Sequence, residues 1–271
     1  MDSDSDSPFT PGPHSSPERQ HMPGGRKSLE GIAVRSFCLG MVLAASSSTT
    51  TTTTTTRTSP FWRLPFFFAS LAIFHFLEFY TTARYSTADA TIKSFLLTAN
   101  WPAYAIAHSS ASLECLLTNL AFPHRASPSS LISLFLTPFL PAALIPSLNA
   151  VLLLAGISLV LVGQAIRSAA MAEAGPSFNH VVQHRKRDTH VLVTTGCYAH
   201  LRHPSYFGFF WWAVGTQLVL GNVLCLAAYV AVLWHFFSSR VRAEESSLVR
   251  FFGRDYVEYQ RRVGTKMPFI G

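Results

Sequence analysis

The chain has 271 residues, of which 49% are hydrophobic and 13% are charged, against roughly 25% charged residues in a typical soluble domain. This composition excludes an ordinary soluble protein and indicates an integral membrane protein. The net charge of +7 does not indicate a nucleic-acid partner, because the basic residues lie in short loops and the C-terminal tail. Basic loops of this kind are expected beside anionic lipid on the cytosolic face.

The N-terminal part divides into three pieces. Residues 1–30 are rich in Ser, Pro, Asp and Gly and should be disordered. Gly31–Ala45 is an apolar stretch that fits a short first membrane helix; a cleaved signal peptide or another targeting segment is the alternative. The Ser/Thr run from Ser46 to Thr56 then predicts a linker, so that residues 31–60 hold a possible first membrane segment followed by a linker.

Residues 61–172 contain the next apolar stretches, which we interpret as the N-terminal membrane helices. A helix needs about 20 residues to cross a bilayer. The candidate segments are Phe61–Tyr80, Trp101–Phe122, Leu131–Ile145 and Leu148–Met171. The third contains Pro138 and Pro141, which favour a broken or re-entrant segment because proline removes an amide donor and bends a helix.

Residues 173–271 form the predicted catalytic region. Phe207–Leu220 and Val223–Ser238 are aromatic-rich and are joined by a Gly-Asn turn, which predicts a helical hairpin. Basic residues at both outer ends place these ends on the cytosolic side. The expected fold is therefore an all-α, polytopic membrane bundle of about six spans, with five to seven open. Its C-terminal half should form a pocket at the cytosolic face, between residues 173–204 and 240–271.

Ionisable residues concentrate at this predicted interface. Arg202-His203-Pro204-Ser205-Tyr206 precedes the hairpin, and Glu244-Glu245 follows it. Ionisable groups at membrane depth are costly and usually functional. Two simpler interpretations stay open: an interfacial anchor of Arg and Tyr, and an i,i+4 ion pair between Arg240 and Glu244. The functional alternative is a site that offers Arg to an anion and Glu to a cation or to hydroxyl groups.

Histidines occur in the loop before the hairpin and within the membrane. His180 and His184 have the spacing of a metal pair, but no third ligand follows, so no metal site is expected. His190–Val193 should be extended, with backbone amides available to an adenine edge or a carboxylate. His75 and Glu78 predict interhelical hydrogen bonds that fix helix packing, with a substrate role as the alternative.

These motifs resemble the signature of the integral membrane methyltransferases, and most of all the isoprenylcysteine carboxyl methyltransferase family. The resemblance is dense over residues 160–271 and looser over residues 74–122. It is carried by Arg202–Tyr206, Glu244-Glu245, Met171–Gly175, Phe178–Gln183, Asp188–Thr194, Gly215–Gln217, Ser246–Gly253, Tyr256–Tyr259 and Pro268–Ile270. Residues 1–60 match no family that we can name.

The resemblance implies methyl transfer from S-adenosyl-L-methionine to the C-terminal carboxylate of a farnesyl- or geranylgeranyl-cysteine. The partners would be CaaX-type proteins that have lost their last three residues, and membrane lipid. The enzyme would be a multi-pass protein of the endoplasmic reticulum membrane, with its active site facing the cytosol. The cofactor-binding positions of the family match Gln183, His190, Val191, Leu192, Val193, Tyr198, His203, Pro204, Ser205, Tyr206 and Glu244.

The resemblance also assigns the remaining site residues. Arg240 matches the position that meets the substrate carboxylate, and Arg202 and Glu245 belong to the same catalytic signature. One departure follows Arg240, where Arg242 and Ala243 stand in place of the acidic residues that are often found there. This departure makes the local charge more positive.

The implied chemistry needs no general base, because a carboxyl group with a pKa of about 3.5 is already ionised at neutral pH. The main task is the alignment of the reacting atoms. Three alternatives remain. A phospholipid N-methyltransferase would need a deprotonated amine acceptor, which Arg240 would oppose. A sterol-type reductase usually has more membrane spans. A non-catalytic scaffold or transporter would not require polar groups clustered at one face.

Overall fold

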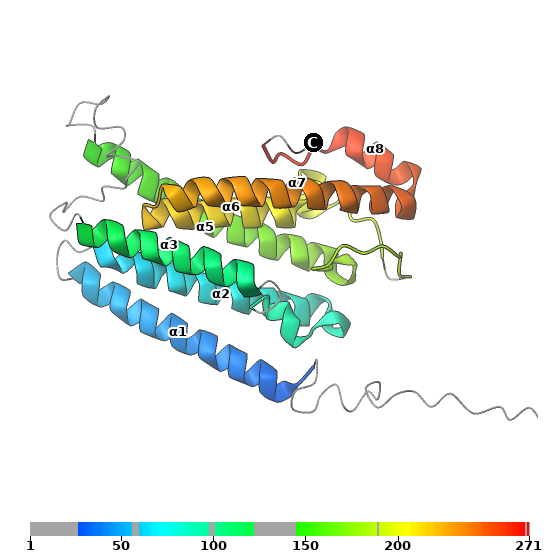
Figure 1. Cartoon of the computed structure of the whole chain (residues 1–271). Coiled ribbons are helices and arrows are strands. Elements are labelled where there is room, and N and C mark those ends of the chain that lie inside the picture. The colour runs from blue at the N-terminus through cyan, green and yellow to red at the C-terminus, as the bar shows by residue number, and fades with distance from the viewer. Residues whose placement is uncertain are drawn as a thin grey trace, which may run out of the picture.

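The computed structural model describes residues 27–55, 60–97, 101–121, 145–188, 190–268 and 270. These residues form a bundle of roughly aligned helices, with no β-strand in the described ranges (Figure 1). The α-helices are α1 (Leu29–Thr55), α2 (Arg63–Tyr85), α3 (Trp101–Ala121), α5 (Ile145–Ala174), α6 (Pro204–Leu220), α7 (Leu224–Phe252) and α8 (Arg254–Arg262). The all-α prediction is thus confirmed.

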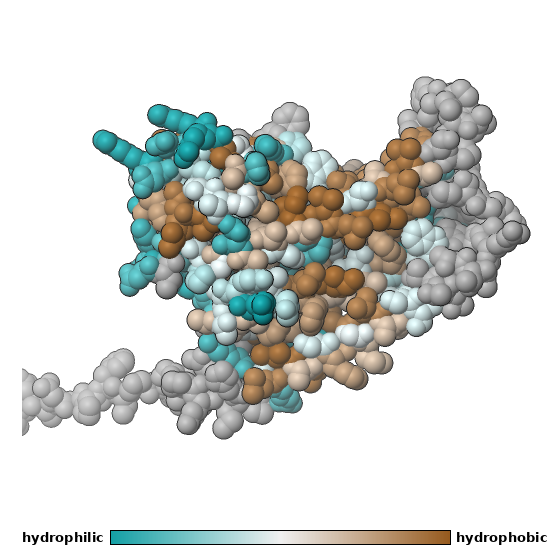
Figure 2. Space-filling model, turned by 180° about the vertical axis from the view of Figure 1, so that it is seen from behind, coloured by the Kyte–Doolittle hydropathy of each residue, from teal (hydrophilic) through white to brown (hydrophobic). Residues whose placement is uncertain are grey.

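Four of the described helices, α1, α2, α5 and α7, are long and apolar enough to cross a membrane. Their outer surfaces carry exposed apolar side chains such as Phe37, Leu154 and Val232, which are 64–69% exposed. Figure 2 shows apolar side chains over the middle of the molecule and hydrophilic ones gathered at one end, which is the end that holds α8 in Figure 1. The chain is therefore a multi-pass membrane protein. The number of about six spans stays a prediction, and the predicted broken segment Leu131–Ile145 lies outside the described residues except at Ile145.

The predicted Ser/Thr linker is wrong, because α1 continues through this run to Thr55. Hydroxyl groups bond back along the helix: Ser48 Oγ donates to the carbonyl of Ala44 over 3.0 Å, and Thr49 Oγ1 to that of Ala45 over 2.8 Å. Such local bonds satisfy the hydroxyls within a helix. The prediction of disorder over residues 1–30 is wrong at its end, since α1 begins at Leu29; residues 1–26 lie outside the described part.

Close packing of α5 against α6 forms the centre of the bundle. Gly156 and Gly163 on α5 face Gly215 and Gly208 on α6. A Cβ atom placed on Gly163 would lie 2.6 Å from the carbonyl oxygen of Gly208. Small residues let two membrane helices approach to backbone contact. The glycines therefore bring the end of α5 directly against the start of α6.

The predicted hairpin of α6 and α7 is confirmed, with Gly221 in the left-handed conformation at the turn. Helix α3 holds this turn. The Glu114 carboxylate accepts hydrogen bonds of 2.7–2.9 Å from three amides at the start of α7. Asn222 Nδ2 donates to the carbonyl of Ala111 over 2.9 Å. The turn lies at the opposite end from the predicted site, so both outer ends of the hairpin meet at the hydrophilic end.

The second arm of the hairpin is longer than the predicted Val223–Ser238, because α7 runs on to Phe252. Polar residues replace apolar ones beyond Ser238 without a helix-breaking residue until Gly253, where φ is +57°. Helix α8 then folds back, and the Tyr259 hydroxyl donates to the carbonyl of Tyr198 over 2.7 Å. One continuous helix consequently carries Arg240, Glu244 and Glu245 out of the apolar bundle.

Candidate functional site

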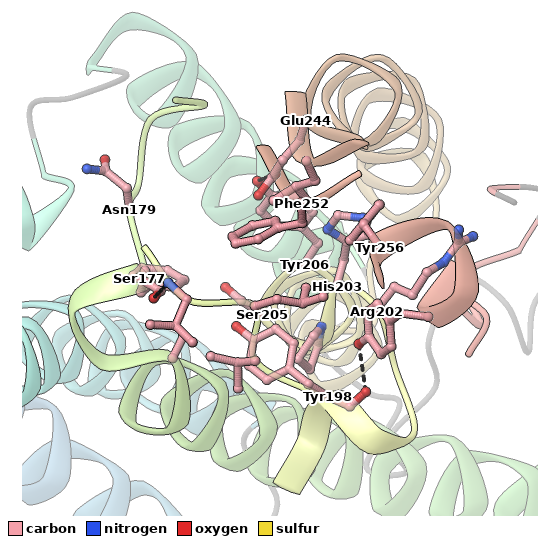
Figure 3. A pocket seen from close by; sticks show the side chains of 18 residues that line it. Ser177, Asn179, Tyr198, Arg202, His203, Ser205, Tyr206, Glu244, Phe252 and Tyr256 are labelled. Carbon is pink, nitrogen blue, oxygen red and sulfur yellow. Dashed lines mark hydrogen bonds between the residues drawn. The ribbon is translucent and has the colours of Figure 1, made fainter. Parts of the chain in front are cut away.

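A pocket opens at the hydrophilic end of the bundle. Figure 3 shows Ser177 and Asn179, from the loop after α5, on one side, and Glu244, Phe252 and Tyr256, from α7 and α8, on the other. The start of α6 forms the wall between them. The predicted site residues that line this pocket are Val191, Leu192, Val193, Tyr198, Arg202, His203, Pro204, Ser205, Tyr206 and Glu244.

Four predicted site residues do not line this pocket: Gln183, His190, Glu245 and Arg240. Gln183 lies on the loop, where its Nε2 donates to the carbonyl of Val181 over 2.8 Å. His190 is buried beside the pocket, and its imidazole Nε2 has no hydrogen-bond partner among the residues that the structure describes. The backbone amide of the next residue, Val191, donates a hydrogen bond to Ser177 Oγ over 3.0 Å. This amide of the predicted extended segment is therefore already bonded within the chain.

Arg240 and Glu244 meet at the hydroxyl group of Tyr206. Arg240 Nε donates to this hydroxyl over 2.7 Å, and the hydroxyl donates to Glu244 Oε2. The alternative of an i,i+4 ion pair does not hold, because none of the ion pairs of the described residues joins Arg240 to Glu244, and the phenol lies between them. A second donor group of Arg240 bonds to the carbonyl of His180, in the loop after α5.

A second cavity lies on the other side of Tyr206, and we call it the acceptor cavity. It is lined by Arg167, Arg240, Tyr104, Phe209, Phe236 and Phe237, among others. It shares Phe178, Asn179, Ser205 and Tyr206 with the first pocket. The walls are thus largely aromatic, and the described lining includes two guanidinium groups, of which Arg167 is paired with Glu78. This arrangement suits an anionic group attached to an apolar body.

Glu245 lies behind the first pocket and holds its wall. Its Oε1 lies 3.1 Å from Arg202 Nη1 and 3.1 Å from His203 Nε2. Its Oε2 accepts a hydrogen bond from Gln260 of α8 over 3.1 Å. Glu245 therefore orients Arg202 and His203, which themselves line the pocket.

A buried ion pair joins the site to the rest of the bundle. The Glu78 carboxylate of α2 binds the Arg167 guanidinium of α5 in a two-point contact, with one bond of 2.7 Å. Arg167 Nη1 also donates to Oγ and to the carbonyl of Ser205, over 3.0 and 3.2 Å. His180 Nε2 lies 2.9 Å from the same carboxylate. The predicted interhelical bonding is confirmed for Glu78.

The partner of Glu78 was not predicted. His75, the neighbour expected to act with it, instead places Nδ1 2.8 Å from the carbonyl of Phe95. The signal that could have found the pair is Arg167 itself, a cation near the end of the most hydrophobic of the four candidate membrane spans in the described part of the chain.

Aromatic side chains close the first pocket, and several were not predicted: Phe178, Phe252 and Tyr256. Burial raises the pKa of the Tyr198 and Tyr256 phenols, and nearby Glu244 raises the pKa of Tyr198 further, so both stay protonated and can donate. The buried Tyr256 hydroxyl and Arg202 Nε have no hydrogen-bond partner in the described part of the chain. Unpaired buried polar groups cost free energy unless a ligand satisfies them.

Comparison with known proteins gives consistent matches. The model of the isoprenylcysteine carboxyl methyltransferase family matches residues 133–250. The protein-S-isoprenylcysteine O-methyltransferase of Saccharomyces cerevisiae is 40% identical over 90% of this chain and 93% of its own length. The human protein of the same name is 37% identical over 88% of this chain and 75% of its own. A solved structure described as the eukaryotic intramembrane Ras methyltransferase superposes with a TM-score of 0.74 at 34% identity, over 89% of this chain and 77% of that one.

Proposed function

The chain belongs to the isoprenylcysteine carboxyl methyltransferase family, and on this basis we propose that it methylates the C-terminal carboxylate of prenylated cysteine. Its partners are then CaaX-type proteins from which the last three residues have been removed. We also propose S-adenosyl-L-methionine as the methyl donor, and the endoplasmic reticulum membrane as the location, with the hydrophilic end in the cytosol. The single observation that supports the proposal most is the junction of two cavities at Tyr206, between Arg240 and Glu244.

The first pocket fits the proposed cofactor in the chemistry of its walls. Phe178, Phe252 and the apolar segment from Val191 to Val193 can enclose a flat base. The unpaired Arg202 Nε and Tyr256 hydroxyl can bond to a carboxylate or to ribose hydroxyls. Glu244 offers negative charge to an ammonium group or a hydroxyl. We propose contact with the cofactor for those predicted cofactor residues that line the pocket, whereas Gln183 and His190 lie outside it.

The acceptor cavity fits a carboxylate next to an apolar thioether. Arg240 can bind the carboxylate through a charge-assisted contact. The neighbouring surface of α7 is an apolar groove beside Arg240, formed by Ala231, Val232 and Phe236. A prenyl chain binds bilayers by itself. We therefore propose that the prenyl group lies along this groove and reaches the site from the lipid, without passing through water.

The chain contributes alignment and water exclusion to the reaction. S-adenosyl-L-methionine supplies an electrophilic methyl group on a positively charged sulfur. Arg240 orients the acceptor carboxylate, and the Tyr206 hydroxyl fixes the Arg240 guanidinium at one point. The aromatic walls keep water out, which favours a reaction between opposite charges. A contact of Arg240 with only one carboxylate oxygen leaves the other oxygen free to attack.

The proposal is tested by methyl transfer from radiolabelled S-adenosyl-L-methionine to N-acetyl-farnesylcysteine, in membranes that contain this chain. We expect label that alkali releases, as from a methyl ester. Alkali-stable label in lipid would instead indicate a phospholipid N-methyltransferase. If folded protein transfers no label at all, the proposal is rejected in favour of a reductase or a non-catalytic protein.

A further inference from the structure

A prenylcysteine at the end of a protein has three branches, and the proposed function accounts for two of them. The carboxylate meets Arg240, and the thioether lies toward the apolar groove on α7. The third branch is the polypeptide that precedes the cysteine. Its backbone amides and carbonyls are polar, and each costs several kcal/mol if left unsatisfied in lipid. The third branch therefore needs a polar route from Arg240 to water.

A third cavity supplies such a route, and we call it the vestibule. Its volume is about 560 Å³, within the range of ~300–1,000 Å³ that is usual for ligand sites. It continues directly from the acceptor cavity, because Leu96, Phe178, Asn179, His180, Phe236 and Arg240 line both. A group held at Arg240 consequently faces the vestibule as well as the apolar groove.

About half of the wall of the vestibule is polar, whereas the groove on α7 is almost entirely apolar. They come from the segment before α1, the end of α2, the two short 3-10 helices η3 (Thr87–Asp89) and η4 (Ile92–Phe95), and the loop after α5. The polar residues include Lys27, Thr82, Asp89, Lys93, Asn179 and Arg187. An extended peptide would find donors and acceptors along this path.

Two contacts hold the walls in place. Lys27 Nζ donates to the carbonyl of Ala88 over 3.0 Å, and Arg187 Nη1 pairs with Asp89 Oδ1 over 2.8 Å. Both contacts link segments that are distant in sequence. The Lys93 side chain is exposed and forms none of the ion pairs of the described residues.

We propose that the vestibule is the binding site for the polypeptide that precedes the prenylcysteine, and that Ala88 and Lys93 border its path. This inference rests on the proposed function and deepens it. It assigns the three branches of the acceptor to three separate surfaces that meet at Arg240. A small acceptor such as N-acetyl-farnesylcysteine has almost no third branch, so it does not use the vestibule.

The first test fills the vestibule. Ala88 is exposed and lines it, whereas the adjacent Thr87 is exposed and does not. Ala88→Trp and its control Thr87→Trp are assayed with N-acetyl-farnesylcysteine and with a farnesylated, uncharged hexapeptide. We expect Ala88→Trp to raise the KM for the hexapeptide by about fivefold or more, and to leave the small acceptor unaffected. Thr87→Trp should change neither. An equal effect of Ala88→Trp on both acceptors, or no effect on the hexapeptide, overturns the inference.

The second test needs no bulky substitution. Lys93→Glu reverses an exposed charge, and Lys266→Glu in the C-terminal tail is its control. Two farnesylated hexapeptides, with Glu or Lys two residues before the cysteine, are compared in non-ionic detergent at low salt. We expect Lys93→Glu to shift the ratio of their KM values by about threefold in favour of the Lys peptide. An unchanged ratio overturns the inference. If the wild-type chain does not methylate N-acetyl-farnesylcysteine either, the proposed function itself fails.

Discussion

The guanidinium of Arg240 lies against the phenol of Tyr206: its Nε is 2.7 Å from the hydroxyl oxygen, and its central carbon is 5.3 Å from the ring centroid. The same hydroxyl donates to Glu244. Tyr206 therefore separates a cation that faces the acceptor cavity from a carboxylate that faces the first pocket. Without this phenol, the two charged side chains, one helical turn apart on α7, would be free to pair with each other.

Tyr206→Phe removes the hydroxyl and keeps the ring. Hydrogen bonds to charged groups contribute about 1.5–3 kcal/mol, so we expect kcat to fall about tenfold or more while the protein stays folded. The measurement is kcat and KM with N-acetyl-farnesylcysteine. Tyr80→Phe, at an exposed tyrosine of α2, serves as the control and should keep wild-type kinetics. Unchanged kcat in Tyr206→Phe would show that the link between Arg240 and Glu244 is not used.

Arg240 and Glu244 should have separate roles, because they lie on opposite sides of Tyr206. Arg240→Ala should raise the acceptor KM about tenfold or more, through loss of a charge-assisted contact, and should leave cofactor affinity nearly unchanged. Glu244→Ala should do the reverse. Cofactor affinity is measured by equilibrium binding in detergent, and the acceptor KM by methyl transfer. Equal losses of both quantities in both variants would refute this division.

The buried pair of Glu78 and Arg167 should matter more for stability than any exposed pair. Their side chains are 1% and 7% exposed. Glu78→Ala leaves the Arg167 charge buried and unpaired, which destabilises a protein by about 3–5 kcal/mol. Asp89→Ala breaks the more exposed pair with Arg187 and should change stability by about 0–1 kcal/mol. Thermal unfolding in detergent compares the two variants. Similar unfolding midpoints would contradict the assignment of Glu78 as a structural partner of Arg167.

The close contact between α5 and α6 predicts that alanine lowers stability when it replaces a glycine in this contact, but not when it replaces a glycine outside it. In Gly163→Ala the new methyl group would meet the carbonyl of Gly208 and the amide of Trp212, both at 2.6 Å. The helices must then move apart, so we expect a lower unfolding temperature and reduced activity. Gly40→Ala in α1 has nothing within 4 Å of the added methyl group. It should be neutral, or stabilising by up to about 1 kcal/mol, because alanine favours a helix over glycine.

Several features of the fold and the site followed from sequence because they are local. Long apolar segments located α2, α3 and α5, and two shorter aromatic-rich ones located the hairpin. The Gly221-Asn222 turn and the basic ends predicted that the hairpin returns to the same end of the bundle. The motif Arg202–Tyr206 and the apolar segment Val191–Val193 line the first pocket, and their contact with the cofactor stays a prediction. The Ser/Thr run after Ala45 was mispredicted, because its composition is typical of linkers. In the structure its hydroxyl groups donate hydrogen bonds to carbonyls one turn earlier, so the run continues the helix.

The sequence by itself determined the membrane class, the family and most residues of the first pocket, since these depend on composition, segment length and a compact motif. The pairing of side chains was decided only by the tertiary structure. Glu78 and Arg167 are 89 residues apart in sequence. Arg240 bonds to Tyr206 on another helix and not to Glu244, its neighbour on the same helix. Helix periodicity predicts which face a residue occupies, but the partner depends on which helices reach backbone contact. Here the glycines of α5 and α6 set that contact, and with it the place of Arg167 beside Ser205.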